Sequence, residues 1–468
     1  MKKKGKFSLK GKKVTVFGLG RSGIGAIKLL LKSGADVFAT EEKAEIPSPL
    51  IIWLESEGVS FELGFHSRRA IEGKDLIVVS PGVNPRIPIL EQARSEKIPI
   101  IGELELAYNF ANGKFIAVTG TSGKSTTVSL IGDILSKHGE DVIVCGNIGV
   151  PVSEVVLNAN KEATFVVEVS SFQLETILNF KPYISVFLNF SDDHLDRYDA
   201  SSEYLNAKLN IFKNQTVDDY AVINKNSLLF SPKTAQIRAK IYYFSIEEPV
   251  ESGTYLSGND AIINVDGAKI KISLNDFKLQ GLHNKENLLS ALCASYLFLK
   301  DRFNESETKN AISEFKELPH RFEFVNNYAG IDFINDSKST KPESTIMALK
   351  CLNKPTILIL GGSEKGTDFT SLANAIANSP FVKMVIITGK TQKKIKTALE
   401  SVDFKKYKLA PSLKSAIHDA ILRAHKGEIV LLSPACASFD EFSDFEERGE
   451  YFKRYVDDFF KRNFFFDN

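Results

Sequence analysis

The amino-acid sequence predicts an α/β protein. Short runs rich in β-branched residues alternate with amphipathic stretches of helical length through most of the chain. This alternation is typical of parallel sheets whose two faces are covered by helices. The chain has 468 residues, which corresponds to about three domains at roughly 150 residues each. We therefore expect consecutive domains at residues 1–102, 103–317 and 318–468.

Composition and charge exclude several classes of partner. The chain carries 59 Lys and Arg residues and 58 Asp and Glu residues, a net charge of +1, so no overall field favours nucleic acid or an anionic membrane. The four cysteines are far apart and form no Cys-x-x-Cys pair, which argues against a disulfide framework and a zinc ribbon. No apolar run approaches the roughly 18 residues that span a bilayer. We expect a cytoplasmic monomer that neither binds nucleic acid nor inserts into a membrane.

The first block begins with a strand, a glycine-rich turn and a helix. Residues 14–17 predict the strand, and the sequence GLGRSG at 18–23 leads into the helix. A second strand covers 36–40 and is followed by Glu41. This order matches the dinucleotide-fold fingerprint, with a pyrophosphate at the helix N-terminus and an acid near the ribose. Because any nucleotide diphosphate presents the same anion, a nicotinamide dehydrogenase and a second nucleotide site are both open. A later strand ends in the turn at 80–82.

The strongest signal is the sequence FIAVTGTSGKSTT at residues 115–127, where a strand passes through glycines into a helix. Backbone N–H groups freed by Gly120 and Gly123 can bind phosphate oxygens, and Lys124 adds a positive charge. The pattern Gly-x-x-Gly-Lys-Ser-Thr is shorter than the usual phosphate loop, and ordinary helix capping is the alternative. With a strand before it and a helix after it, we favour nucleotide phosphate binding.

A phosphate loop of this kind needs oxygen ligands for a metal ion. Ser125 or Thr126 would offer a hydroxyl group to Mg²⁺. Glu168 lies inside the apolar strand sequence FVVEVSS, where a charge is costly unless it meets a cation. The alternative for this carboxylate is a buried ion pair with a lysine.

Acidic residues and a histidine follow the next strand, in the sequence NFSDDHLDRY. Asp192, Asp193, His194 and Asp196 would lie at the carboxyl end of the sheet, where open α/β sheets bind ligands. The histidine is either a metal ligand or a solvated loop residue, and the neighbouring phosphate loop favours the ligand. Lys208 follows in YLNAKLNIF, and helical periodicity alone predicts that it is exposed.

The end of the second block and the third block have different patterns. Residues 254–274 alternate around Asp266-Gly267, which is a type I′ hairpin signal, and predict an antiparallel flap beside the parallel sheet. The third block begins at 318–321. Its predicted strands have the sequences IDFINDS, TILILGG, MVIITG and EIVLLSP, each separated by a helical stretch.

Ordered motifs along essentially the whole chain resemble a known family. They are GLGRSG, SPGV, GTSGKSTT, GNIGVP, EVSSFQLE, LNFSDDHLDRY, AKLNIF, GLHNKENLLSA, LPHRFE, INDSKST, LILGGSEKGTDF and SPACASFDEF. The chain resembles the Mur ligases, ATP-dependent enzymes that form amide bonds in peptidoglycan precursor synthesis. It is most similar to the branch that adds D-glutamate, because of its opening, its LPHRFE, NDSKST and SPACASFDEFSDFEERG sequences and its lack of a DNPR-type motif.

The resemblance implies a fold, cofactors and substrates. It implies a Rossmann-like N-terminal domain for the UDP-linked substrate, a central P-loop ATPase-like domain for ATP, and a Rossmann-like C-terminal domain for the amino acid. ATP and Mg²⁺ would be the cofactors, and UDP-N-acetylmuramoyl-L-alanine and D-glutamate the substrates. The substrate carboxylate would attack the γ-phosphate of ATP to give an acyl phosphate, and the amine of D-glutamate would then displace phosphate.

Matched position by position, the resemblance implies four groups of site residues. ATP would be bound by Gly120, Thr121, Ser122, Gly123, Lys124, Ser125, Thr126, Asn284, Asn287, Arg321 and Asp336. The UDP-linked substrate would be bound by Gly20, Ser22, Glu41, Gly82, Asn147, Ser170 and Gln173. D-glutamate would be bound by Thr340, Lys365, Ser438 and Phe445. Metal ions would be held by Ser125, Glu168, His194 and Lys208.

The catalytic residues implied by the resemblance are Lys124, His194 and Lys208. In the family this last lysine is carbamylated, which turns a cation into a carboxylate-like ligand. The chain departs from the family pattern at Ser122, where Asn is usual, and at Glu41, where Asp is commoner. The rival functions are another Mur-type or folylpolyglutamate-type ligase and, from a different class, a non-catalytic nucleotide sensor or a dehydrogenase.

Overall fold

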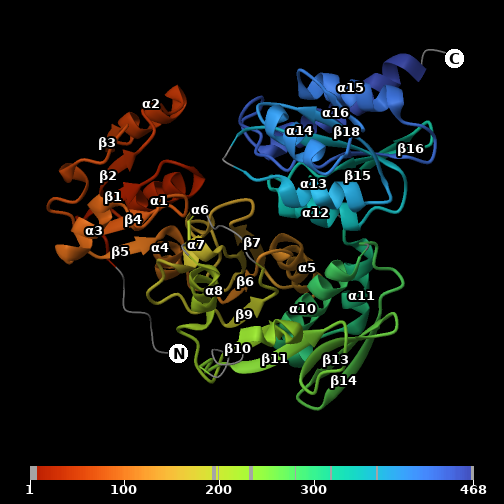
Figure 1. Ribbon diagram of the computed structural model, residues 1–468. Coiled ribbons are helices and arrows are strands. Elements are labelled where there is room, and N and C mark those ends of the chain that lie inside the picture. Colours follow the sequence, from red (N-terminus) through yellow and green to blue (C-terminus); the bar gives the residue numbers. More distant parts are fainter. Residues whose placement is uncertain are drawn as a thin grey trace. The chain divides into compact units, whose positions relative to one another are not determined.

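Figure 1 shows the computed structural model of the chain. The structure describes residues 8–191, 197–198, 200–230, 236–279, 281–316, 319–364 and 367–464. The chain divides into two compact units, Met1–Phe315 and Lys316–Asn468. The first unit contains two sheets and the second contains one. Each of the three predicted blocks therefore has its own sheet, while the exact boundaries at 102/103 and 317/318 stay predictions.

The first sheet has five parallel strands in the order β3-β2-β1-β4-β5. Its strands are β1 (Lys13–Phe17), β2 (Asp36–Glu41), β3 (Ser60–Leu63), β4 (Leu76–Val79) and β5 (Ile100–Gly102). Its helices are α1 (Arg21–Lys32), α2 (Ser48–Ser56) and α3 (Pro88–Ser95). The predicted strand, glycine turn and helix at the start of the chain are confirmed.

The second sheet has nine strands in the order β14-β13-β12-β11-β10-β9-β6-β8-β7. Its strands are β6 (Phe115–Thr119), β7 (Val142–Gly146), β8 (Thr164–Glu168), β9 (Ile184–Phe187), β10 (Tyr220–Asn224), β11 (Lys240–Ser245), β12 (Gly253–Ser257), β13 (Asp260–Val265) and β14 (Ala268–Ser273). The helices that accompany this sheet are α5 (Lys124–Lys137), α6 (Val152–Val155), α7 (Ser171–Leu174), α8 (Ser201–Leu209), α10 (Leu282–Leu299) and α11 (Glu305–Glu314). The strands from β7 to β12 run parallel.

The hairpin predicted from Asp266-Gly267 is confirmed. Both residues have positive φ angles, 50° and 86°, as a type I′ turn requires, and Val265 pairs with Ala268 across the turn. Through β12 the hairpin extends the edge of the parallel sheet rather than lying beside it. At the other edge, β7 has only Cys145 buried, because this strand has a neighbouring strand on one side only.

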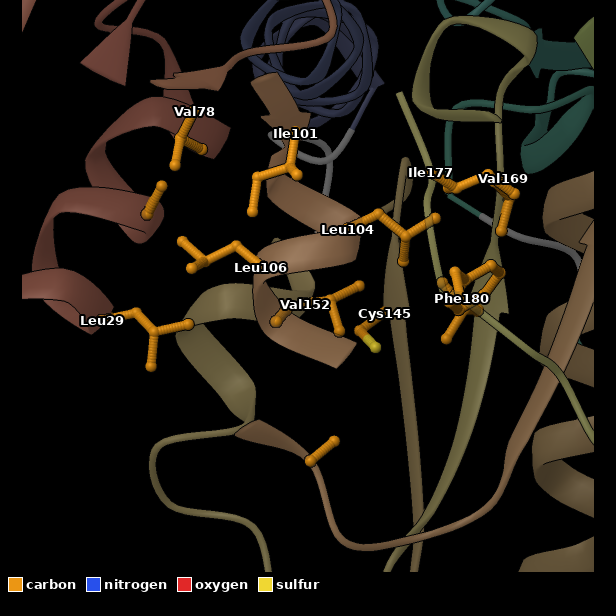
Figure 2. Close-up of a cluster of buried hydrophobic side chains, with 14 of the residues drawn as sticks. Leu29, Val78, Ile101, Leu104, Leu106, Cys145, Val152, Val169, Ile177 and Phe180 are labelled. Carbon is orange, nitrogen blue, oxygen red and sulfur yellow. The ribbon is translucent and has the colours of Figure 1, made fainter. Parts of the chain in front are cut away.

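Helix α4 (Glu103–Phe110) connects the two sheets of the first unit. Its Leu104 and Leu106 are fully buried in one apolar cluster with Leu29 of α1 and Phe180. In Figure 2, Leu106 lies on the side of Leu29 and Leu104 on the side of Phe180. Burying a leucine side chain contributes about 1.5–3 kcal/mol. Apolar packing therefore fixes the first sheet against the second within this unit.

The second unit contains a six-stranded sheet in the order β15-β16-β20-β17-β18-β19, parallel except for β15. Its strands are β15 (Glu323–Tyr328), β16 (Ile331–Asn335), β17 (Thr356–Gly361), β18 (Val382–Thr388), β19 (Tyr407–Leu409) and β20 (Ile429–Leu432). Its helices are α12 (Pro342–Lys350), α13 (Thr370–Asn378), α14 (Gln392–Ser401), α15 (Leu413–Arg423) and α16 (Phe445–Phe464). Separate apolar clusters lie on its two faces, one including α13 and α14 and the other α15 and α16. Among the helices that the structure describes, none is long and apolar enough to cross a membrane.

Candidate functional site

The predicted phosphate loop lies between β6 and α5. Gly120 and Gly123 have φ angles of 151° and 84°, in the region that favours glycine. A Cβ at Gly123 would lie 2.2 Å from the side-chain oxygen of Asn287, so a larger residue there would displace this asparagine. Helix α5 begins directly after the loop, at Lys124, and the positive end of its dipole faces any bound anion. The loop thus has the backbone shape and polarity of an anion site.

Asn189, two residues after β9, holds this loop in place. Its Oδ1 accepts hydrogen bonds from the backbone N–H groups of Thr121 at 3.1 Å and Ser122 at 2.9 Å. The Nζ of Lys124 donates to the carbonyl oxygens of Gly120 at 3.0 Å and Thr121 at 2.9 Å. The positive charge of this lysine is therefore concentrated at the loop, as the sequence predicts.

Glu168 and Ser125 form a buried pair beside the loop. Ser125 Oγ donates to Glu168 Oε2 at 2.6 Å, and Asn147 Nδ2 donates to Glu168 Oε1 at 2.8 Å. Glu168 is only 3% exposed because β8 is an inner strand of the sheet. Thr126 is buried in the same first turn of α5 as Ser125. The predicted proximity of a hydroxyl group and a carboxylate at the phosphate loop is present.

Lys208 is 1% exposed, so the exposure predicted from helical periodicity is wrong. It shares the buried face of α8 with Tyr204 and Ala207, and this face packs inward because residues spaced by three or four lie on one side of a helix. Its Nζ lies 4.4 Å from the centre of the Tyr204 ring and donates to the carbonyl oxygen of Gly120 at 2.8 Å. The structure thus brings Lys208 to the phosphate loop.

The remaining predicted metal ligand, His194, lies outside the described residues, as do Asp192, Asp193 and Asp196. No group of three or more His, Cys, Asp or Glu side chains suited to a metal occurs among the residues that are described. The pair of Ser125 and Glu168 still fits Mg²⁺, which prefers oxygen ligands and is commonly held by one or two carboxylates together with substrate phosphates.

Asn287, near the start of α10, lies against the loop, and Asn284 lies next to it. Asn287 Oδ1 accepts a hydrogen bond from Thr127 Oγ1 at 3.4 Å, and Asn287 Nδ2 donates to Asn284 Oδ1 at 3.3 Å. Thr127 belongs to α5. The structure therefore places Asn287 beside the phosphate loop and Asn284 next to Asn287, and their contact with adenosine stays a prediction.

The glycine turn after β1 carries the predicted contacts of the UDP-linked substrate. Gly20 precedes α1, and Ser22 lies in its first turn. Glu41 Oε2 accepts a hydrogen bond from the backbone N–H of Leu19 at 2.8 Å. The carboxylate therefore orders the turn itself, which is a local structural role, and its contact with uridine stays a prediction.

Gly82 lies in a β-turn that packs on the glycine turn. The N–H of Val83 donates to the carbonyl oxygen of Ser80 at 3.0 Å, and Ser80 Oγ donates to the carbonyl oxygen of Gly18 at 2.9 Å. A Cβ at Gly18 would lie 2.9 Å from a methyl group of Val83. The predicted turn after β4 is confirmed, and it brings Gly82 close to the turn that precedes α1.

Ser170 and Gln173 form a capping box at the start of α7. Ser170 Oγ accepts from the N–H of Gln173 at 3.3 Å, and Gln173 Oε1 accepts from the N–H of Ser170 at 3.0 Å. These bonds satisfy backbone groups at a helix N-terminus. Capping accounts for both residue types, and their predicted substrate contact stays a prediction.

In the second unit, Asp336 is 4% exposed. Its Oδ2 accepts a hydrogen bond from Ser433 Oγ at 2.6 Å and its Oδ1 accepts one from the N–H of Phe322 at 3.1 Å. Burial raises the pKa of Asp336 to about 6, although these hydrogen bonds and the charge of Arg321 oppose the rise. The structure places Asp336 and Arg321 close enough to interact, and their contact with ATP stays a prediction.

Arg448 of α16 joins two of the predicted D-glutamate segments. Its Nε and Nη2 donate to Ser337 Oγ and O at 2.9 and 2.8 Å, and its Nη1 donates to the carbonyl oxygen of Cys436 at 3.0 Å. Ser337 Oγ in turn donates to the carbonyl oxygen of Phe445 at 2.8 Å. Thr340 lies three residues beyond Ser337, and Ser438, two residues beyond Cys436, is buried; Lys365 lies outside the described residues.

Comparison with known proteins agrees with this arrangement. Residues 12–102 match the model of the Mur ligase MurD-like N-terminal domain, 118–295 that of the Mur ligase middle domain, and 320–436 that of the Mur ligase glutamate ligase domain. The UDP-N-acetylmuramoylalanine--D-glutamate ligase of Clostridioides difficile is 39% identical over 95% of this chain and 98% of its own length. The chain belongs to the Mur ligase family. The counterpart in Koribacter versatilis, of the same name, is 39% identical over 96% of this chain and 98% of its own.

Solved structures share the fold of this Mur ligase. The UDP-N-acetylmuramate-alanine ligase from Thermotoga maritima has a TM-score of 0.60 at 20% identity and covers 96% of this chain and 100% of its own. The MurF ligase from Thermotoga maritima, solved in complex with ADP, has a TM-score of 0.58 at 17% identity and covers 97% of each chain. The predicted α/β fold with Mur ligase N-terminal, middle and C-terminal domains is confirmed.

Sequence reasoning missed several residues that order the candidate site segments within each unit of this Mur ligase. Asn189 orients the phosphate loop, Ser433 donates to Asp336, and Arg448 joins two loops. Asn189 was detectable, since a polar residue directly after a buried strand lies at the ligand-binding edge of the sheet. Ser433 follows β20 in the same way. Arg448 gave no such signal, because its helix alternates charged and apolar residues in an ordinary surface pattern.

Proposed function

We propose that this Mur ligase joins D-glutamate to UDP-N-acetylmuramoyl-L-alanine in peptidoglycan precursor synthesis, with conversion of ATP to ADP and phosphate. One observation carries the proposal: relatives named as ligases of UDP-N-acetylmuramoylalanine and D-glutamate match nearly the whole chain, at 39% identity over 95% of it. The phosphate loop supports the ATP-dependent part of this chemistry independently, because its backbone, Lys124 and the start of α5 suit a bound polyphosphate.

The reaction needs ATP because a carboxylate is a poor electrophile. In the first step, an oxygen of the alanyl carboxylate forms a bond to the γ-phosphorus while the bond from that phosphorus to the β–γ bridging oxygen of ATP breaks, and ADP leaves. The charge that develops on the transferred group meets the Lys124 ammonium group and the N-terminus of α5. In the second step, the neutral amine of D-glutamate forms a bond to the acyl carbon, one N–H proton is released to solvent, and the bond from that carbon to phosphate breaks as the tetrahedral intermediate collapses to the amide.

Ser125 and Glu168 would hold a Mg²⁺ ion beside the phosphates, because their oxygens lie 2.6 Å apart and are both buried. When bound, this ion neutralises phosphate charge and orients the γ-phosphoryl group. Lys208, which lies against Gly120, would contribute to a second metal site with His194 once its amine is carbamylated, because the carbamate supplies carboxylate-like oxygen ligands. Asn284, Asn287, Arg321 and Asp336 are proposed to contact the rest of the nucleotide.

The amino acid and the UDP-linked substrate are assigned to other segments. Thr340, Lys365, Ser438 and Phe445 are proposed to bind D-glutamate, because a dicarboxylic amino acid requires a cation and hydroxyl donors. The turn that contains Gly82 and the turn that precedes α1 are proposed to bind the UDP-linked substrate, because a diphosphate suits backbone N–H groups next to a helix N-terminus.

Phosphate release by the purified chain tests the proposal. The full set contains ATP, Mg²⁺, UDP-N-acetylmuramoyl-L-alanine and one amino acid at a time. We expect turnover with D-glutamate and none with L-glutamate, L-alanine or meso-diaminopimelate. A parallel series with UDP-N-acetylmuramate and L-alanine tests the alanine-adding reaction. Turnover in that series alone, or with an amino acid other than D-glutamate, would overturn the proposed substrates.

A further inference from the structure

Arg197 lies between the two sheets of the first unit and contacts elements of both. Its Nη1 donates to the carbonyl oxygen of Pro81 at 2.9 Å, and its Nη2 makes a longer hydrogen bond of 3.4 Å to the carbonyl oxygen of Val83. Nη2 also donates to Glu175 Oε2 at 2.8 Å. The guanidinium carbon lies 4.0 Å from the centre of the Phe172 ring. One side chain thus connects the turn after β4 with the segment around α7.

These contacts fix the orientation of one peptide group. A peptide bond is planar and trans, so its carbonyl oxygen and its N–H group point in opposite directions; the described residues contain no cis peptide bonds. Because the Pro81 oxygen points at Arg197, the N–H of Gly82 points away from it. The Val83 carbonyl, on the other side of Gly82, is held by the same guanidinium group. Arg197 therefore sets the direction in which the Gly82 N–H can donate.

The environment of Arg197 suits an arginine and not a lysine. Its side chain is 13% exposed, and the side chain of its partner Glu175 is similarly sheltered. A planar guanidinium group can donate several hydrogen bonds in a fixed fork and stack on an aromatic ring, which an ammonium group cannot do. Two carbonyl oxygens, one carboxylate and the Phe172 ring use all of these properties at once.

A nearby arginine provides a contrast. Arg86 also joins the two parts of the unit, through an ion pair of 3.2 Å with Glu203 of α8, but its side chain is 57% exposed. Exposed ion pairs contribute little because water and salt screen them. Both arginines therefore connect the two parts of the first unit. Only Arg197, of these two, donates hydrogen bonds to the carbonyl groups beside Gly82.

We infer that Arg197 is a positioning residue for the UDP-linked substrate. By holding the carbonyl groups of Pro81 and Val83, it directs the Gly82 N–H at the diphosphate of that substrate. It also fixes the position of this turn relative to the second sheet. The inference deepens the proposed function and rests on it. Arg197 itself acts through the turn, so its loss should affect one substrate far more than the other two.

The test compares Arg197→Ala and Arg197→Lys with Arg86→Ala as the matched control. For Arg197→Ala we expect the KM for UDP-N-acetylmuramoyl-L-alanine to rise about 10- to 30-fold, the change that loss of a charged hydrogen-bond donor produces. The KM values for ATP and D-glutamate should stay within about twofold of wild type, because the phosphate loop is unchanged. Arg197→Lys should fall between, and Arg86→Ala should match wild type.

Calorimetric titration with UDP-N-acetylmuramoyl-L-alanine, without ATP, gives a second measurement that does not need turnover. The dissociation constant should rise by a similar factor in Arg197→Ala. Glu175→Gln keeps Arg197 but removes the charge that orients it, so the dissociation constant should rise by a smaller factor. This variant provides the test if Arg197→Ala does not fold. Unchanged affinity in these variants, or an equal change in the KM of all three substrates, would overturn the inference. Absence of turnover in the wild-type chain would instead overturn the proposed function.

Discussion

Lys208 and Gly120 are joined by a hydrogen bond of 2.8 Å from the side-chain ammonium group to the backbone carbonyl oxygen. The two residues lie 88 positions apart in the sequence, on α8 and at the first glycine of the phosphate loop. This bond brings a buried cation to the loop that is proposed to bind ATP. It also accounts for the burial of Lys208 in α8, because the ammonium group has a hydrogen-bond acceptor inside the protein.

Replacement of Lys208 by alanine is expected to lower turnover on the order of 10²-fold, as loss of one charged group in a catalytic site typically does. If the lysine carries a carbamate that acts as a metal ligand, added acetate should restore part of the rate, because the truncated side chain leaves space for a small carboxylate. The measurement is the rate as a function of acetate concentration. Lys213→Ala, an exposed lysine just beyond α8, should show full activity and no response. Full activity of Lys208→Ala with a flat acetate response would exclude the carbamate ligand.

Replacement of Lys124 by alanine should reduce turnover by roughly 10²–10³-fold while the chain still folds, because the loop loses the charge that stabilises the transferred phosphoryl group. The matched control is Lys137→Ala, which removes an exposed lysine from the last turn of the same helix. Steady-state rates with all three substrates, together with circular dichroism spectra, give the comparison. Wild-type turnover in Lys124→Ala would refute the role of this lysine.

Glu168→Gln should raise the Mg²⁺ concentration needed for half-maximal rate by at least about tenfold, in line with the effect of losing a group that holds or orients a metal ligand. The amide keeps the size of the side chain but loses its negative charge, so the fold should persist. Asp133→Asn removes an exposed carboxylate from α5 outside the loop and should leave the Mg²⁺ requirement unchanged. An identical Mg²⁺ requirement in wild type and Glu168→Gln would exclude this carboxylate from the metal site.

Asp336→Asn should stabilise the chain in the absence of ligands at neutral pH. Burial raises the pKa of Asp336 from 3.8 to about 6, so between these values the folded chain binds more protons than the unfolded chain. Its stability must then fall as the pH rises from about 4 to about 6. The asparagine variant escapes this loss, which reaches about 3 kcal/mol at pH 7 because each pKa unit corresponds to about 1.4 kcal/mol.

Urea-induced unfolding of wild type and Asp336→Asn between pH 4 and pH 8 checks this expectation. The difference in the free energy of unfolding should be near zero at pH 4 and should grow until about pH 6. Asp332→Asn, in the strand that ends just before Asp336, should show a difference that stays nearly constant above about pH 5. Burial raises the pKa of Asp332, but hydrogen bonds from Lys354 and Asn327 outweigh it and lower the pKa overall, so this carboxylate titrates below that range. A difference between wild type and Asp336→Asn that does not vary with pH would contradict the buried, titrating carboxylate.

Local sequence signals predict the parts of the fold that depend on neighbouring residues. A type I′ turn needs positive φ angles, which Asp-Gly pairs such as Asp266-Gly267 adopt readily. The strand, glycine loop and helix at 115–127 follow from β-branched residues, glycines and a capping sequence. β15 and β19 were not predicted. They lie at the edges of their sheet, where burial on one side only leaves a weak pattern.

The site itself was predictable only in part, because many of its contacts join distant segments. Nothing near Lys208 in the sequence indicates Gly120, and Arg448 lies 111 positions from Ser337. The family resemblance supplied Lys208 as a candidate, whereas periodicity assigned it to the surface. Arg197 belongs to the LNFSDDHLDRY motif, but its hydrogen bond to Pro81 depends on how the first sheet packs on the second, and the motif does not indicate this packing.

Equilibrium binding of ATP with Mg²⁺, followed by measurement of ADP formation, tests the phosphate loop most directly. We expect saturable nucleotide binding by the wild-type chain, weaker binding by Lys124→Ala, and ADP formation only when the UDP-linked substrate is present, with sustained turnover when D-glutamate is added. The contradicting result is a wild-type chain that neither binds ATP nor forms ADP with every substrate supplied. In that case the loop at Gly120–Thr126 does not support phosphoryl transfer to a substrate carboxylate.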